Sequence, residues 1–157
     1  MRRGAPCTFL KYGVDIALNT GNFMYFIPML LTQRFFKDDK ETLLKLLEIY
    51  HEEMVIIHLG QNWDINWHNN DYIPTEEQYL QMVAFKTGVL PRMALRMCTH
   101  ILGLNESLQE AFFNFAQNIG IAFQIQDDII NLESEEFAKG KEILGEDIYE
   151  VIIFRII

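Results

Sequence analysis

The amino-acid sequence predicts an all-α protein. Apolar residues recur at helical spacing from Glu41 to His58 and again from Leu108 to Phe123. Alternation of the strand type is almost absent before the apolar, β-branched run Val151–Ile157. With 50% hydrophobic residues in a chain of 157, one sizeable core is expected.

The first strongly predicted helix spans Glu41–His58. Its apolar positions are Leu43, Leu44, Leu46, Leu47, Tyr50, Met54, Val55 and Ile57. The following stretch, Gly60–Pro74, is rich in Asn, Asp, Trp and His, which favours an irregular loop. We therefore expect a loop between two helices, in which Trp63 and Trp67 serve as packing residues.

A second helix is predicted to begin after Thr75. Thr75 and Gln78 have the spacing of a capping box, and the helix is expected to run through Phe85. Gly88 is compatible with a C-terminal cap of that helix, with Lys86 complementing the helix dipole.

Two further helical stretches follow. One apolar stretch runs from Pro91 to Gly103, and Asn105 is a suitable cap for a long helix after it. The apolar stripe of that long helix comprises Leu108, Ala111, Phe112, Phe115, Ile119 and Phe123. We expect this stripe, and its phenylalanines in particular, to belong to the core.

Composition excludes several classes of function. The formal charge of −9 argues against partners that are polyanions, such as nucleic acid or an acidic membrane surface. Cys7 and Cys98 form no CxxC pair, so neither a disulfide framework nor a thiolate zinc site is indicated. The apolar stretch Phe23–Leu31 is too short for stable membrane insertion, and the N-terminus lacks the apolar segment of a signal peptide. A cytoplasmic protein is expected.

Oxygen-bearing side chains gather in Gln124–Asn131. Asp127 and Asp128 lie four and three residues before Asn131, so a helix places all three toward one side, together with Gln124. Adjacent carboxylates among apolar residues suit a hard cation such as Mg²⁺, which also binds substrate phosphates. An exposed acidic helix end explains the same residues, and spacing alone leaves both interpretations open.

Further motifs occur along the chain in a defined order. They are Arg2-Arg3-Gly4 with Pro6, Gly60-Gln61 with Asp64 and Trp67, Pro74-Thr75-Glu76-Glu77-Gln78-Tyr79-Leu80, Lys86-Thr87-Gly88, and Gln124–Asn131. With these motifs in this order, the sequence resembles the trans-isoprenyl diphosphate synthases, the family of farnesyl and geranylgeranyl diphosphate synthases. The resemblance covers most of the chain. It implies the helical-bundle isoprenoid synthase fold and a prenyltransferase that joins isopentenyl diphosphate to an allylic diphosphate.

The resemblance also implies a role for individual residues. Asp127, Asp128 and Asn131, with Asp64 nearby, match the metal side of the site, which would bind Mg²⁺. Lys86, Arg2 and Lys141 match the cationic partners of the allylic diphosphate, and Arg3 matches a residue that holds isopentenyl diphosphate. Thr87 and Gln124 match positions whose oxygens face the allylic carbocation.

Other features depart from the family pattern. The family's first aspartate-rich motif lies upstream of Arg-Arg-Gly, whereas this sequence begins directly before Arg2. We therefore expect a partial domain over residues 1–150, lacking the N-terminal helices, and a divergent or truncated tail over residues 151–157. The family usually dimerises, so a homodimer of the complete form is expected.

Three alternative functions compete with this interpretation of the sequence. A non-catalytic homologous subunit that works through a partner stays open. A terpene cyclase is disfavoured, because Asn131-Leu132-Glu133-Ser134-Glu135 does not reproduce the cyclase metal spacing. A di-iron site is disfavoured too, since Glu48 and His51 form one Glu-x-x-His motif and such a site needs two.

Overall fold

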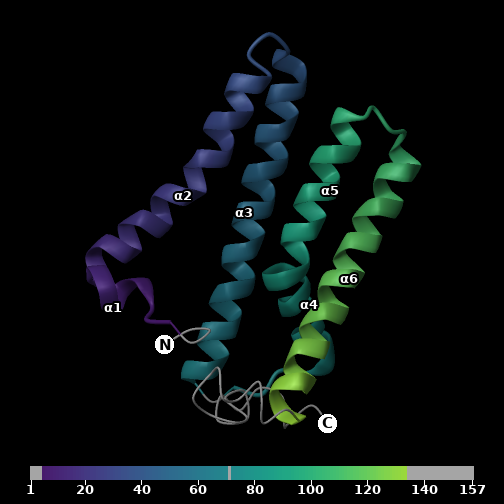
Figure 1. Cartoon of the computed structure of the whole chain (residues 1–157). Coiled ribbons are helices and arrows are strands. Elements are labelled where there is room, and N and C mark those ends of the chain that lie inside the picture. The colour runs from purple at the N-terminus through teal and green to yellow at the C-terminus, as the bar shows by residue number, and fades with distance from the viewer. Residues whose placement is uncertain (1–4, 71, 134–157) are drawn as a thin grey trace.

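The computed structural model describes residues 5–70 and 72–133, with side chains up to residue 130. This part of the chain folds into helices and contains no strand, which confirms the all-α prediction. The long helices run up and down in two hairpins that pack side by side (Figure 1). None of the described helices combines the length and hydropathy needed to cross a bilayer. The expected tail, 151–157, lies outside the described residues.

The first hairpin consists of α2 (Val14–Phe35) and α3 (Lys40–Asn69), preceded by the short α1 (Thr8–Tyr12). The carboxylate of Asp39 accepts a hydrogen bond from the Thr42 amide at 3.0 Å and caps the start of α3. The Tyr50 hydroxyl donates a hydrogen bond to the Tyr25 carbonyl and so ties α3 to α2. Within the described part of the chain, α2 has no buried residue.

The helix predicted over Glu41–His58 is present, but the predicted loop over Gly60–Pro74 is largely wrong. α3 continues without a break to Asn69. Trp67 explains the extension, because its ring is buried against Met82 and Val83. Asn, Trp and His disfavour a helix by only a few tenths of a kcal/mol each, and tertiary packing outweighs that preference.

The next helix begins as predicted. Thr75 Oγ1 accepts from the Gln78 amide at 3.3 Å, and Gln78 Oε1 accepts from the Thr75 amide at 2.8 Å, which completes the capping box. The helix then continues beyond the predicted end, as α4 (Glu76–Val83), the π-helical turn η1 (Ala84–Gly88) and α5 (Val89–Ile101).

Gly88 is not the C-terminal cap that the sequence allowed. Its φ of −65° is helical, and the residue is buried in η1, where it lies against Gln117 and Gly120 of α6. Pro91 lies inside this continuous run, in the turn that follows η1, and supplies no backbone N–H there. The chain instead turns at Gly103, whose φ of +64° favours glycine.

The last helix, α6 (Glu106–Glu133), packs against α5 in the second hairpin (Figure 1). Asn105 caps it as predicted, because its side-chain oxygen accepts from the Leu108 amide at 3.0 Å. The prediction that the apolar stripe of α6 is core is wrong for this chain, since Phe112, Phe115 and Phe123 are exposed. α6 instead buries small residues, Ala116 and Gly120, which allow the helices to approach closely.

Candidate active site

The predicted site residues whose side chains are described lie at one end of the bundle, where α3 and α6 end on either side of η1. Two glycines make this approach possible. A Cβ on Gly60 of α3 would lie 2.5 Å from the Lys86 amide nitrogen, and a Cβ on Gly120 of α6 would lie 2.4 Å from Gly88 Cα. Any larger residue at either position would push the π turn away from its neighbours.

The π turn contains two of the predicted residues, Lys86 and Thr87, and their side chains contact different helices. Lys86 reaches α3, where it forms an ion pair with Asp64. Thr87 reaches α6, where it contacts Gln124. Isolated π turns inside α-helices are rare and are often found at functional sites. Here the adjacent side chains Lys86 and Thr87 of the turn contact two different helices.

Asp64 and Lys86 are both partly exposed. Their side chains retain 20% and 31% of their accessible surface, so the pair stands at the edge of the site and can meet a ligand. The sequence placed both residues in the site, and the structure brings them together. Gln61, one turn before Asp64 on α3, is exposed.

A chain of hydrogen bonds connects Thr87 to the aspartate motif. Thr87 Oγ1 donates to Gln124 Oε1 at 2.7 Å, and Gln124 Nε2 donates to Asp128 Oδ1 at 2.8 Å. The hydroxyl of Tyr79 on α4 donates to the second carboxylate oxygen, Asp128 Oδ2. Both oxygens of Asp128 are therefore engaged by side chains of this chain.

Burial changes the electrostatics of Asp128. The residue is only 9% exposed, and burial raises the pKa of its carboxyl group; the negative charge of Asp127 raises it further. The hydrogen bonds from Tyr79 and Gln124 lower the pKa and so oppose part of this increase. A buried carboxylate beside a second carboxylate is unfavourable until a cation neutralises the pair.

The donor atoms at this end of the bundle are of the chemical type that binds a hard divalent cation. Asp127 and Asp128 supply only oxygen, which is what Mg²⁺ prefers. Asp127 is half-buried, and within the described part of the chain no hydrogen bond or ion pair engages its carboxylate. Among the described residues, no group of three or more His, Cys, Asp or Glu side chains is arranged to hold a metal ion. Mg²⁺ is commonly bound by one or two carboxylates together with water and substrate phosphates, so the Asp127–Asp128 pair is sufficient to begin such a site.

Several predicted residues cannot be placed in this arrangement. Arg2, Arg3 and Lys141 lie outside the described residues. Asn131 lies in the last turn of α6, but its side chain is not among those described. Their assigned roles stay predictions.

The tryptophans on either side of Asp64 pack as expected, with one difference. Trp67 is buried, whereas Trp63 keeps 37% of its surface exposed. Trp63 stacks on both Trp67 and Phe85, with ring centroids 6.2 and 5.4 Å apart. The stack fixes the end of α3 against the π turn next to Lys86.

Sequence reasoning missed a buried charge network beneath the site. Glu53 of α3 accepts hydrogen bonds from Arg92 and Arg96 of α5, and Arg92 also donates to Gln117 Oε1 on α6 at 2.6 Å. Gln117 contacts Gly88, so the network supports the π turn. A signal was available, because Glu53 follows Leu46, Ile49 and Tyr50 at helical spacing on the buried face of α3.

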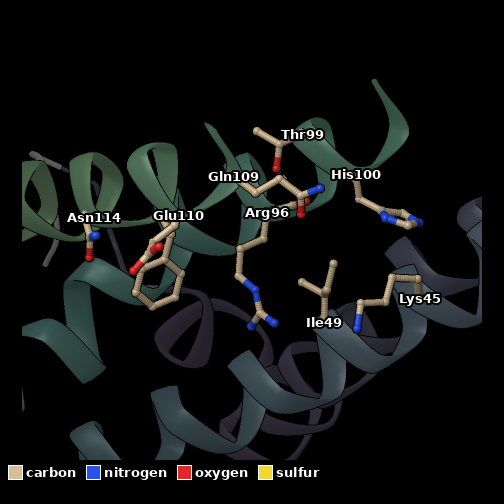
Figure 2. Close-up of a pocket in the computed structure, with 9 residues that line it drawn as sticks. Lys45, Ile49, Arg96, Thr99, His100, Gln109, Glu110 and Asn114 are labelled. Carbon is tan, nitrogen blue, oxygen red and sulfur yellow. Dashed lines mark hydrogen bonds between the residues drawn. The ribbon is translucent and has the colours of Figure 1, made fainter. Parts of the chain in front are cut away.

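A cavity of about 420 Å³ lies at the opposite end of the bundle, between the starts of α3 and α6 and the end of α5 (Figure 2). Lys45, Arg96 and His100 line it, together with Glu110. Its positive charge is largely compensated, since Lys45 pairs with Glu48 and Arg96 pairs with Glu52 and Glu53. This cavity is a weaker match for a diphosphate than the π-turn end of the bundle.

Comparison with known proteins identifies the family. The sequence profile described as Polyprenyl synthetase matches residues 1–153. A geranylgeranyl pyrophosphate synthase of Apiospora sacchari is 39% identical over 150 residues, an alignment that covers 96% of this chain and 42% of the relative. A second, from Dictyostelium discoideum, is 34% identical over 150 residues, covering 96% of this chain and 46% of the relative.

A solved structure agrees with these relatives. The crystal structure of a geranylgeranyl pyrophosphate synthase superimposes with a TM-score of 0.79 at 30% identity, covering 94% of this chain and 44% of that chain. This likeness supports the helical isoprenoid synthase fold predicted from the sequence. The chain thus spans less than half the length of the relatives it matches.

Proposed function

The chain belongs to the polyprenyl synthetase family, and we propose that the protein elongates an allylic diphosphate with isopentenyl diphosphate. The observation that carries this proposal is the π turn, because it presents a cation, Lys86, and an oriented hydroxyl, Thr87, next to two aspartates. A prenyl transfer needs these groups: positive charge on the departing diphosphate and oxygen lone pairs near the resulting carbocation.

We propose that Asp127 and Asp128, with Asn131 and Asp64 nearby, hold Mg²⁺ against the allylic diphosphate. Bound there, Mg²⁺ would supply positive charge that stabilises the leaving diphosphate as its carbon–oxygen bond breaks. Two observations support this proposal. The donor atoms are all oxygens, and burial raises the pKa of Asp128, so that a cation is needed to stabilise its buried negative charge.

Lys86 is proposed to bind the same diphosphate directly. Its ammonium group is held by Asp64, which keeps the long side chain in one orientation at the edge of the site. Lysine suits a phosphate as a compact charge. Arg2 and Lys141 would join it on the allylic diphosphate, and Arg3 would hold isopentenyl diphosphate.

Thr87 and Gln124 are proposed to face the allylic carbon once the diphosphate has left. The hydrogen of the Thr87 hydroxyl is used in its bond to Gln124 Oε1, so the oxygen keeps its lone pairs for the positive carbon. The double bond of isopentenyl diphosphate then attacks that carbon. Loss of a proton to the released diphosphate completes a chain five carbons longer.

A second copy of the protein is the proposed partner. What supports it is the surface of α2, where Leu18, Phe23 and Phe26 are among many exposed apolar residues. Changing Leu18 to Glu on that surface should lower the mass measured by light scattering from dimer to monomer. A variant that stays dimeric would place the dimer contact elsewhere on the protein. A wild-type protein that is already monomeric would contradict the proposed dimer.

The proposed function is tested by incorporation of labelled isopentenyl diphosphate into geranyl or farnesyl diphosphate with Mg²⁺. The matched relatives are named geranylgeranyl pyrophosphate synthases, so geranylgeranyl diphosphate is the product to look for first. The assay should compare this chain with a version extended by any coding sequence upstream of Arg2. Mg²⁺-dependent product from either supports the proposal. Two folded proteins without product would favour a non-catalytic homologous subunit.

A further inference from the structure

Tyr79 has no role in the assignments above, although it touches the aspartate motif. Its hydroxyl donates a hydrogen bond to Asp128, 49 residues away in the sequence. We propose that Tyr79 is a positioning residue for the prenyl transfer. By holding Asp128, it fixes the amide of Gln124 and, through that amide, the hydroxyl of Thr87. This inference rests on the proposed function.

The direction of each hydrogen bond supports the proposal. An ionised carboxylate only accepts, so Gln124 must turn its NH₂ group toward Asp128. The amide oxygen of Gln124 then points the other way and accepts from Thr87. The Thr87 hydrogen is thereby drawn away from the reacting carbon. The orientation of a hydroxyl on η1 thus depends on a carboxylate in the last turns of α6.

Tyr79 is well placed to hold that carboxylate. Its ring packs against the buried cluster of Trp67, Met82 and Val83, so packing fixes the position of the hydroxyl. The hydroxyl and the Gln124 amide occupy one carboxylate oxygen each, which prevents Asp128 from rotating about its last bond. Without the hydroxyl, one oxygen of Asp128 would lose its partner and the Gln124 amide would lose a fixed acceptor.

The variant that tests this is Tyr79→Phe, because it keeps the ring in the cluster and removes only the hydroxyl. The matched control is Tyr72→Phe, which removes the hydroxyl bonded to Gln78 Oε1 at 3.1 Å, outside the site. Loss of an orienting hydrogen bond next to a metal ligand should lower kcat by about tenfold with both KM values unchanged. Tyr72→Phe should keep the wild-type kcat.

A second measurement needs no substrate. In a nuclear magnetic resonance spectrum of the ¹⁵N-labelled protein, the side-chain amide signals of Gln124 should move in Tyr79→Phe and stay in place in Tyr72→Phe. Unmoved Gln124 signals, or a kcat equal to that of wild type, would overturn the proposal. If the wild-type protein makes no product, the proposed function fails. The Gln124 signals then still show whether Tyr79 fixes the orientation of the Gln124 side-chain amide.

Discussion

Arg92 and Glu53 form an ion pair that is almost completely buried. Arg92 Nε lies 3.0 Å from Glu53 Oε2, and the two residues keep only 3% and 1% of their accessible surface. The pair joins α5 to α3, and Arg92 extends it to Gln117 on α6. Three helices therefore meet at one charge-assisted network directly behind the π turn.

Changing Glu53 to Gln should destabilise the protein severely. The substitution leaves the guanidinium of Arg92 buried without an opposite charge, which costs about 3–5 kcal/mol. The free energy of unfolding from urea titration measures the effect. The control is Glu52→Gln, which removes a partner of Arg96 that is 55% exposed; it should cost less than about 1 kcal/mol. Equal losses in both variants would contradict a special role for the buried pair.

Changing Gly120 to Ala should also lower stability, by about 1–3 kcal/mol, because the new methyl group overpacks the contact with Gly88. Gly21→Ala is the matched control. Gly21 lies inside α2 with open space around it, so alanine there should stabilise the helix by about 0.5–1 kcal/mol. Thermal unfolding of the two variants should therefore shift in opposite directions. A gain in stability in both would mean that α6 and η1 are farther apart than described.

Changing Asp128 to Asn should stabilise the protein near neutral pH in the absence of metal. The folded-state pKa of Asp128 lies above its unfolded value of 3.8 because of burial. The protonated carboxyl group of Asp128 therefore stabilises the folded protein fully at pH values below the unfolded pKa. This stabilisation is lost as the pH rises through the folded-state pKa. Asparagine stays neutral and avoids this loss.

The expected signature is a melting temperature above that of wild type near neutral pH, with a difference that shrinks as the pH falls toward the unfolded pKa. Added Mg²⁺ with a diphosphate should raise the melting temperature of wild type and have little effect on the variant. A variant less stable than wild type at neutral pH would show that the hydrogen bonds to Asp128 outweigh its burial.

Local signals in the sequence predicted the helix starts well. The capping box at Thr75 and the cap at Asn105 both depend on residues within three positions, and both are present. The end of α3 was predicted poorly, because the burial of Trp67 depends on its packing against Met82 and Val83 of the next helix, which residue preferences along α3 do not reveal. The apolar stripe of α6 gave no reliable sign of its packing face, since that helix buries Ala116 and Gly120.

The candidate site was also partly predictable from the sequence. Motif order led to Asp64, Lys86, Thr87, Gln124 and Asp128, and the structure brings these residues into contact in two groups. The π turn that carries Lys86 and Thr87 has no local sequence signal. Tyr79 was also missed, because its contact with Asp128 joins two helices.

The most direct test of the account is the rate of isopentenyl diphosphate incorporation in Asp127→Asn. This change keeps the shape of the half-buried side chain and removes its charge, and Asp15→Asn, on exposed α2, is the control. Loss of several kcal/mol of charge stabilisation should slow the reaction by about a hundredfold or more. The control should retain the wild-type rate. An Asp127→Asn protein as fast as wild type would contradict a metal-assisted prenyl transfer at this end of the bundle.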